Sequence, residues 1–579
     1  MNRAWFLWSA ATSFAVLVVG CQPFIWERED RQRVDLGVAS KPGVLADSAA
    51  YRDTIGSLTY LEGLSPMRVR GFGLVGGLGE DGSRDCPKNV YTQLVQMLYK
   101  QRRTSGRVVG IEDVPPEKLI DDTSTGVVLV QGEIPPAAVK GTRFDVSVMA
   151  LPGSQTKSLR GGRLYPAELR IFRDVAPGAA VTGRALAHAA GPLFLNPFSE
   201  GEAATKSNPL QGVVLGGGIV TEDRRLRLVL LEPSHVWARR IQDRINAHFP
   251  GPQKVADAVS PSFIQLEVPA GYHGDEAHFL ALVRNLYVSR DPRFEATRAH
   301  VLAEEILRPT APHPRIALAF EGLGRAALPV LNDLYDHPKD YVSFHAAVAG
   351  LRLGDHIAGD AVTLHAQDPT GVFRFQAIRA LAEAKKMGGA AVALRNLLAD
   401  KDPRVQIAAY EALIKREDPT IHSTRVGGDN FVLNEIPASE SKLVYVKRSG
   451  RRQIAVFGSD LKCIPPVFYR APDGSLTITA ESGDDMLTVL RVVAPSGTTS
   501  PPIPASFGLP ELIKLLGNEA GVGLDGKVTG LGLDYGAVVR AMYALSKSRT
   551  LNTQFILEQP NVAELFGPPR RAGRPESEL

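Results

Sequence analysis

The sequence predicts a multidomain α+β protein. Its 579 residues are more than a single hydrophobic core usually serves. Three regions with different hydrophobic patterns follow one another along the chain, and each pattern is typical of a different architecture. We expect a mixed α/β core over residues 61–270, a solenoid of helical repeats over residues 291–418, and a β-rich domain with helices over residues 430–550.

The overall composition argues against several classes of function. Charged residues make up 22% and hydrophobic residues 44%, as in ordinary water-soluble proteins. A net charge of +4 over this length lacks the basic bias of nucleic-acid-binding proteins. Cys86 and Cys463 could pair in an oxidising compartment, although they lie in different predicted domains. Neither has a cysteine or histidine neighbour at zinc-ligand spacing, so no metal site is predicted.

The amino terminus has the features of an export signal. Arg3 precedes an apolar run that ends at Gly20 and Cys21, which predicts a signal peptide over residues 1–20. The local string resembles the bacterial lipobox, and that resemblance implies that Cys21 is lipidated. An uncleaved membrane anchor is the alternative, but the run is short for a bilayer of roughly 30 Å. Gln22 follows the cysteine, which by the same resemblance implies anchoring at the outer membrane, with residues 21–60 as a tether.

The core region alternates strand and helix patterns. Strands are predicted over Gly126–Gln131, Phe144–Met149 and Leu226–Leu231, where apolar residues alternate or cluster between turn residues. Helices are predicted over Val90–Tyr99 and Val236–Phe249, where apolar residues recur three and four positions apart. These patterns indicate a mixed region of about two subdomains.

A glycine-rich block runs from residue 71 to residue 78. It contains the G-x-G-x-x-G spacing of dinucleotide-binding folds, which requires a helix directly after it, but the turn residues Glu80, Asp81 and Gly82 follow instead. We therefore interpret the glycines as structural, allowing tight turns and close backbone approach. The expected structural glycines are Gly71, Gly73, Gly76, Gly77, Gly161 and Gly162.

Two further blocks follow the glycine block. The first contains a proline pair at 135–136, an alternating strand over 140–148 and the turn Lys157-Ser158-Leu159-Arg160-Gly161-Gly162. The second contains Gly216–Val220, the strand over 226–231 and the helix over 236–249. In the turn and just after it, Lys157, Arg160 and Arg163 form either a solvated loop or a candidate assembly surface that contacts an acidic face of a neighbouring subunit.

These three blocks, in this order, resemble the flagellar basal-body P-ring proteins over residues 67–270. Gly76 departs from the apolar residue that the family carries. The resemblance implies a structural protein, not an enzyme, that forms a homo-oligomer around the rod in the periplasm and contacts the rod or other basal-body proteins, without a cofactor. The lipid anchor and about 300 residues beyond position 270 depart from the family.

The region 291–418 reads as helical repeats. His337-Pro338, Asp368-Pro369 and Asp402-Pro403 each precede an apolar helical pattern, at intervals of roughly 31 to 34 residues. Proline fits the first turn of a helix, where its missing N–H is not needed. We expect HEAT-like helix pairs, which usually bind proteins; an ordinary helical bundle is the alternative.

The carboxyl-terminal part shows no family resemblance and no catalytic motif. Beta patterns over 442–493 precede helical ones over 509–516 and 535–545, and residues 568–579 are expected to be disordered. Two functions remain open: a structural component of the flagellar basal body, or an envelope lipoprotein adaptor that binds a protein partner and has no part in motility. A cell-wall hydrolase is a distant third.

Overall fold

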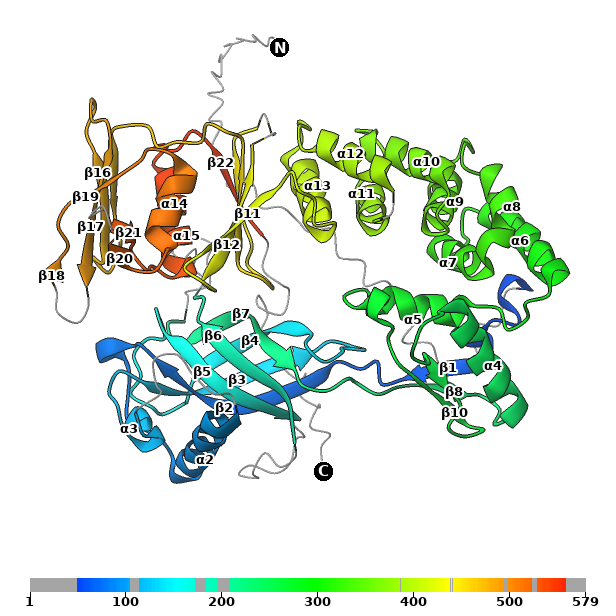
Figure 1. The fold of residues 1–579 in the computed structure, drawn as a ribbon, viewed down its shortest axis with the longest axis horizontal. Helices are drawn as coiled ribbons and strands as arrows, with labels where there is room; N and C mark the ends of the chain where they lie inside the picture. Colours follow the sequence, from blue (N-terminus) through cyan, green and yellow to red (C-terminus); the bar gives the residue numbers. More distant parts are fainter. Residues whose placement is uncertain are drawn as a thin grey trace, which may run out of the picture.

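The computed structural model describes residues 49–104, 114–171, 184–195, 208–385, 387–437, 439, 441–493, 498–522 and 528–558. Helices and sheets both contribute, as expected for an α+β protein, and four folded parts follow one another round a closed circuit (Figure 1). The expected signal peptide, Cys21 and the 568–579 tail lie outside the described residues. No helix among the described residues is long and apolar enough to cross a bilayer.

The first part is a closed six-stranded barrel whose strands are ordered β2-β3-β4-β7-β6-β5, with every neighbouring pair antiparallel. Its interior is lined by aliphatic side chains, including Val130, Val146 and Leu169. The strand bounds are β2 Met67–Gly76, β3 Gly126–Ile134, β4 Arg143–Ala150, β5 Arg163–Ile171, β6 Ala185–Pro192 and β7 Gln211–Val220.

Helix α2 (Lys88–Thr104) covers the outside of the barrel together with the short helix α3 (Pro116–Ile120). Val90, Leu94 and Leu98 recur every four residues along α2 and pack against Leu74 of the barrel. The helical pattern seen in the sequence over 90–99 is therefore confirmed, and this apolar stripe is what attaches the helix.

The second part is a small α/β unit beside the barrel. Its sheet has the order β1-β8-β10-β9, and β8 pairs antiparallel with both neighbours. Helices α4 and α5 cover the sheet through a shared apolar core, and the sequence predictions of β8 and α4 are confirmed. The bounds are β1 Thr59–Glu62, β8 Leu226–Leu230, α4 His235–His248, β9 Ala256–Asp257, β10 Phe263–Leu266 and α5 Glu276–Asn285.

Residues 49–60, expected to be a tether, are part of this fold. They form a 3-10 turn (Ala49–Tyr51), the short helix α1 (Ile55–Leu58) and the start of β1. Tyr51 and Ile55 are fully buried because they pack on the helices that follow in the chain. The charged residues around them hid this contribution in the sequence.

The third part consists of helices stacked in two rows (Figure 1). One row contains α7, α9, α11 and α13, and the other contains α6, α8, α10 and α12. The bounds are α6 Pro292–Ile306, α7 His313–Leu323, α8 Leu328–Asn332, α9 Asp340–Arg352, α10 His356–Gln367, α11 Arg374–Glu383, α12 Gly388–Leu397 and α13 Pro403–Lys415.

The expected role of proline is correct for one repeat and wrong for two. Pro403 occupies the first turn of α13, where Asp402 accepts a hydrogen bond from the Arg404 N–H at 2.9 Å. Pro338 and Pro369 lie in the loops before α9 and α11. The Asp368 carboxylate accepts hydrogen bonds from both the N–H and the hydroxyl of Thr370. This local turn delays the start of α11.

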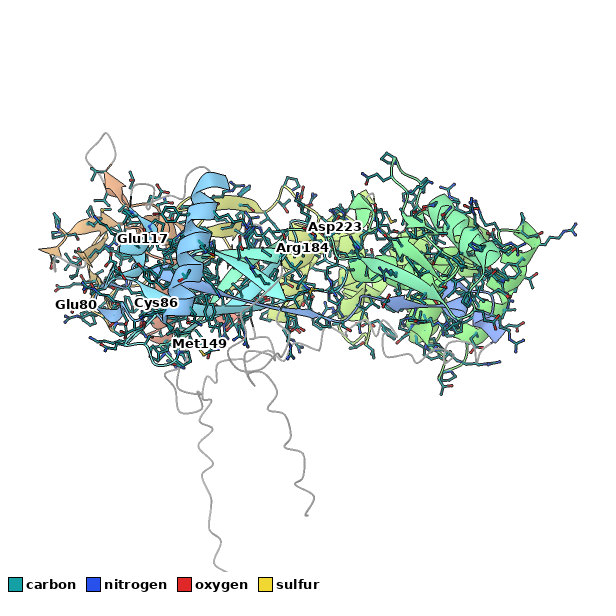
Figure 2. All side chains as sticks on the ribbon, turned by 90° about the horizontal axis from the view of Figure 1, so that it is seen from below. Glu80, Cys86, Glu117, Met149, Arg184 and Asp223 are labelled. Atoms are coloured by element: carbon teal, nitrogen blue, oxygen red, sulfur yellow. The ribbon has the colours of Figure 1, made fainter. Side chains whose placement is uncertain are left out.

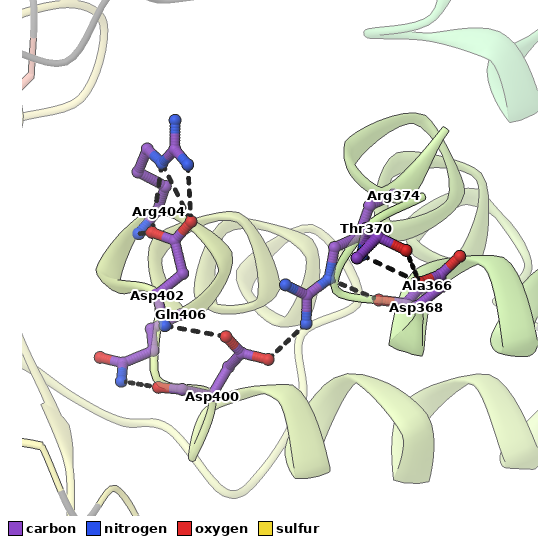
Figure 3. Close-up of polar contacts among 8 residues, drawn as sticks. All are labelled: Ala366, Asp368, Thr370, Arg374, Asp400, Asp402, Arg404 and Gln406. Atoms are coloured by element: carbon purple, nitrogen blue, oxygen red, sulfur yellow. Dashed lines mark hydrogen bonds and ion pairs between the residues drawn. The ribbon is translucent and has the colours of Figure 1, made fainter. Parts of the chain in front are cut away.

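Arg374 links successive repeats (Figure 3). Its Nε donates to the carbonyl oxygen of Ala366 at 3.1 Å, and its guanidinium also forms an ion pair with Asp400. Asp400 in turn accepts from the Asp402 N–H at 2.8 Å. The side-chain amide of Gln406 then donates to the Asp400 carbonyl oxygen. One buried guanidinium therefore connects α10, α11 and the start of α13.

The fourth part has two five-stranded sheets with α14 (Leu509–Gly517) and α15 (Tyr535–Lys547) between them (Figure 1), and a two-stranded sheet of β20 and β21. The first sheet has the order β11-β12-β14-β13-β22, and in the second β15-β16-β17 is extended by β18 and β19. The bounds are β11 His422–Val426, β12 Phe431–Ile436, β13 Leu443–Val446, β14 Gln453–Phe457, β15 Val467–Arg470, β16 Leu476–Ala480, β17 Leu487–Val493, β18 Thr498–Thr499, β19 Ile503–Ala505, β20 Gly521–Val522, β21 Val528–Gly530 and β22 Gln554–Leu557.

Helix α13 packs against the first sheet of the fourth part. Asn434 of β12 donates to the hydroxyl of Tyr410 at 2.6 Å, and the hydroxyl of Tyr445 donates to Glu411 at 3.1 Å. Apolar residues of this sheet belong to the same core as the helices. The third and fourth parts therefore share a continuous interface.

The barrel closes through a close approach of β2 to β5. A Cβ on Gly71 would lie 2.1 Å from the carbonyl oxygen of Glu168, and one on Gly76 would lie 2.3 Å from the Tyr165 hydroxyl oxygen. Gly71, Gly73 and Gly76 lie within strand β2, so close approach is their role. The expected tight turns occur at Gly77 and Gly161, whose φ angles are +80° and +69°.

We predict that Gly71→Ala destabilises the protein by about 3 kcal/mol, the upper part of the range for overpacked cores, because a backbone carbonyl cannot rotate away. Gly389→Ala is the matched control. Its Cβ would meet nothing within 4 Å on helix α12, and alanine favours helix. Urea denaturation followed by circular dichroism measures both; equal stability of the two variants would contradict this account of barrel closure.

Candidate assembly surface

The turn that connects β4 to β5 carries Lys157 and Arg160, and Arg163 follows it as the first residue of β5. The backbone of the turn is held firmly: the Lys157 N–H donates to the Asp81 carbonyl oxygen and the Leu159 N–H to that of Pro209, both at 2.8 Å. The Leu159 side chain is fully buried in the barrel core. This anchoring leaves the three cations exposed on a fixed loop.

The three cations have no acidic partner among the described residues. Among the residues that the structure describes, no carboxylate lies within ion-pair distance of Lys157, Arg160 or Arg163. Exposed charges without partners contribute little to stability. They remain available to an acidic surface on another molecule.

Arg163 differs from the other two because it lies near the fourth part of the chain. Burial, together with the positive charges of Arg163 and Arg143, lowers the pKa of Arg452 to about 10. Arg452 donates to the carbonyl oxygen of Asp429 at 2.6 Å. Arg163 therefore lies near a cationic side chain of the carboxyl-terminal part.

Asp145 joins the barrel to the carboxyl-terminal part. Its carboxylate accepts a hydrogen bond from the Gly216 N–H at 2.5 Å and, through both oxygens, from the Gly450 N–H at 3.0 Å. Gly216 and Gly450 have φ angles of +58° and +64°. A Cβ on Gly216 would lie 3.1 Å from the Gly450 carbonyl oxygen. We call this contact the seam.

Apolar residues of the barrel complete the seam. Phe194 and Leu215 are buried in the core of the carboxyl-terminal part and are absent from that of the barrel. The rings of Phe194 and Tyr535 lie 5.8 Å apart between centroids. Burial raises the pKa of Asp145, although its two backbone hydrogen bonds act in the opposite direction. The seam therefore combines apolar packing with a partly buried carboxyl group whose desolvation is unfavourable.

Sequence analysis did not identify Asp145 as a contact residue. It appeared only as a polar residue that alternates with Phe144 and Val146 in a strand. The partner loop is 305 residues away in the sequence, and no local pattern relates the two. The run of glycines at 216–218 was the one visible sign of a close approach.

A ladder of polar and charged side chains runs from α5 along the row of helices α7, α9, α11 and α13. His278 Nε2 of α5 lies 2.9 Å from Glu321 Oε1, and Arg352 lies 3.6 Å from the other Glu321 oxygen. Arg352 also contacts Glu383 at 3.1 Å, and Lys415 lies 3.7 Å from Glu383. Acidic and basic side chains alternate from α7 through α9 and α11 to α13, and His278 of α5 adjoins the first of them. The ladder therefore couples the α/β unit to the repeats.

Potential sites for chemistry are not apparent in the described part of the chain. No three His, Cys, Asp or Glu side chains there are grouped as metal ligands. Cys86 and Cys463 are both free thiols. Cys86 lies on the helical side of the barrel and Cys463 in the core of the carboxyl-terminal part. Figure 2 shows Cys86 in the same region as Glu80 and Glu117.

Comparison with known proteins bears on the barrel and the α/β unit. Residues 54–300 match the family model for the flagellar P-ring protein. The P-ring resemblance of this region is confirmed. The P-ring match covers the barrel and the α/β unit and ends within α6. By its name, a ring protein of the flagellum is a structural component, which agrees with the expectation that this chain is not an enzyme.

Several flagellar P-ring proteins resemble the chain individually. The Caulobacter vibrioides protein is 29% identical over 262 residues, which is 43% of this chain and 64% of that protein. The Bradyrhizobium protein is 30% identical over 257 residues, or 42% and 63%, and the Geobacter metallireducens protein 29% over 248 residues, or 41% and 62%. The chain thus spans a little under two thirds of the length of these P-ring relatives.

We predict that Glu321→Gln destabilises the protein by about 3 kcal/mol, the lower part of the range for breaking a buried ion pair. Burial raises the Glu321 pKa, but the His278 hydrogen bond and the nearby positive charges outweigh it, so the net pKa is lowered. The stabilisation is therefore present above the ordinary value of 4.5 and is lost as the pH falls through the folded-state pKa.

Urea denaturation at pH 7 and at pH 4 or below tests whether the Glu321 charge causes this stabilisation. The stability difference between wild type and Glu321→Gln should shrink at the acidic pH. Arg308→Ala is the control: it removes an exposed pair with Glu305 and should cost less than about 1 kcal/mol. A constant difference between wild type and Glu321→Gln at all pH values would show that the carboxylate charge is not the cause.

Proposed function

We propose that this protein is a structural component of the bacterial flagellar basal body that assembles as a P-ring-like ring around the rod in the periplasm. The observation that carries the proposal is the family match over residues 54–300. That match coincides with the barrel and the α/β unit, and it includes all three sequence blocks. Homo-oligomerisation and contact with the rod or other basal-body proteins are part of the proposal.

The exposed turn between β4 and β5 supports one assembly face. A closed ring of identical subunits uses heterologous contacts, so each subunit presents two different faces. Cations held on a rigid backbone without intramolecular partners add steering and specificity to such a contact. Lys157 and Arg160 meet this description most fully, and Arg163 extends the face toward the seam.

The helical part supports a separate docking role. We propose that residues 291–418 form a HEAT-like solenoid that binds another envelope component, because stacked helix pairs present extended protein-binding surfaces. The repeated Asp caps and the alternating charge ladder favour this interpretation over an ordinary bundle. The domain division into core, repeats and carboxyl-terminal unit belongs to this proposal.

An envelope lipoprotein adaptor without a role in motility is the second candidate. The observation that favours it is the seam, which covers part of the barrel with the chain's own carboxyl-terminal part. In both cases we propose export, lipidation at Cys21 and anchoring at the outer membrane. Swimming motility separates the two candidates, because only the first requires the protein for a working flagellum.

We predict that replacing Lys157, Arg160 and Arg163 together with Ala leaves the monomer folded and weakens self-association at least tenfold, with loss of motility. A control of equal charge change is Arg239→Ala with Lys254→Ala and Arg293→Ala, all exposed positions elsewhere. Sedimentation velocity, electron microscopy of basal bodies and swimming assays report the outcome. Normal ring particles and swimming in the first variant would defeat the assembly role.

We further predict that Cys21→Ser leaves unprocessed precursor and abolishes metabolic labelling of the protein with fatty acid. The thiol is the acceptor of the first lipid in the resemblance to lipoproteins, and serine cannot replace it. Cys86→Ser serves as the control because it removes another free thiol without touching the signal. Labelling that persists in Cys21→Ser would exclude lipidation at this position.

A further inference from the structure

The four folded parts form a circuit in which one junction lacks a chain connection. Two strand connections join the barrel to the α/β unit, residues 63–66 and 221–225. Helix α5 leads directly into α6, and α13 leads into β11. The described residues of the carboxyl-terminal part meet the barrel through the non-covalent contacts of the seam, which join residues 305 positions apart. Figure 1 shows this junction beside β6 and β7.

The seam has two different, complementary faces. The barrel face supplies the acceptor Asp145 and the apolar residues Phe194 and Leu215. The carboxyl-terminal face supplies the Gly450 N–H and the core around Tyr535. Heterologous ring contacts need such a pair of unlike faces on one subunit.

We propose that the seam is exchangeable, and that in the assembled state the carboxyl-terminal part of one copy docks on the barrel face of a second copy. This inference rests on the proposed assembly function and names the second partner surface for it. The same hydrogen bonds and apolar contacts form within one chain or between two, so exchange loses no seam contact.

Concentration decides which form is populated. An intramolecular contact competes at an effective concentration on the order of mM. Dilute protein therefore closes its own seam. Copies packed densely reach comparable local concentrations, and contacts between neighbours then compete with closure.

Opening the seam requires the barrel to move relative to the α/β unit, to which the connections 63–66 and 221–225 join it. Arg224 spans them, donating to the carbonyl oxygens of Pro135 at 2.9 Å, Gly63 at 2.9 Å and Ser65 at 2.7 Å. None of these acceptors belongs to the seam. A change in the orientation of the barrel about these connections leaves both seam faces intact, but it must break these hydrogen bonds and the packing of Leu64 and Ala137 in the core of the α/β unit.

The small size of the seam favours an exchangeable contact over a permanent one. Partial burial removes water from the Asp145 carboxylate, and hydrogen bonds from two backbone N–H groups offset this cost. Both carboxylate oxygens lie 3.0 Å from the Gly450 nitrogen. Among the described residues of the barrel, Phe194 and Leu215 are buried in the apolar core on the other side, and Val213 packs against it. Such a contact is smaller than the continuous core shared by α13 and the first sheet.

A complementation experiment with the full chain tests the proposal. Leu215→Asp disables the barrel face and Gly450→Val the opposite face, because valine is strained at a φ of +64°. Each variant alone lacks an intact seam within or between chains. An equimolar mixture contains one intact pairing, between the barrel of the Gly450→Val copy and the carboxyl-terminal part of the Leu215→Asp copy.

Sedimentation velocity with one variant fluorescently labelled measures association. We expect a 1:1 complex in the mixture with at least tenfold tighter association than in either variant alone. Leu215→Asp mixed with the double variant Leu215→Asp/Gly450→Val is the negative control, since every barrel face is then disabled. Circular dichroism and melting of each variant establish folding, and Asp145→Ala replaces Leu215→Asp if that variant does not fold.

The outcomes separate this inference from the proposed function. If the mixture does not associate while the wild type forms rings that depend on Lys157, Arg160 and Arg163, exchange is wrong and ring assembly stands. If neither the mixture nor the wild type associates at any concentration up to about 1 mM, the range of intramolecular effective concentrations, both are wrong. If the mixture associates and neither variant does so by itself, the seam is the second assembly face.

Discussion

The approach of β2 to β5 is the constraint on which the rest of the barrel depends. No side chain fits between Gly71 and the Glu168 carbonyl oxygen, so these two strands can close the sheet only because β2 carries glycine there. Closure in turn fixes the ends of the strands. The β4–β5 turn and the Gly216 bulge both take their positions from strands that belong to the closed barrel, which places the exposed cations and Asp145 on its surface.

Polar groups at the junctions between parts follow one pattern. At three of the junctions a charged side chain binds backbone groups of another part: Arg224 binds carbonyl oxygens near the strand connections, Arg244 donates to those of Tyr287 and Gly322, and Asp145 accepts from Gly450. Glu558 similarly accepts from the Arg448 and Ser449 N–H groups in the seam loop. Charged groups bound to fixed backbone dipoles specify orientation more strictly than apolar contact does.

The P-ring-like region and the additional residues contribute different surfaces to the molecule. The barrel carries an exposed cationic turn, while the helical part and the carboxyl-terminal part add a second and a third surface. The charge ladder from His278 to Lys415 fixes the repeats against the P-ring-like region. The added residues are therefore integrated with the core rather than appended to it by a flexible linker, and any ring built from this chain must accommodate them.

The sequence by itself determined the fold class, several strands and helices, and the family resemblance, because hydrophobic periodicity and short glycine-rich blocks are local properties. It indicated the exposed cations at Lys157 and Arg160 for the same reason. It could not reveal the folded state of residues 49–60, the loop positions of Pro338 and Pro369, or the contact of Asp145 with Gly450. Those features depend on which distant segments meet, and only the tertiary structure decides that: a carboxylate in an alternating strand looks the same in sequence whether it faces water or a backbone N–H 305 residues away.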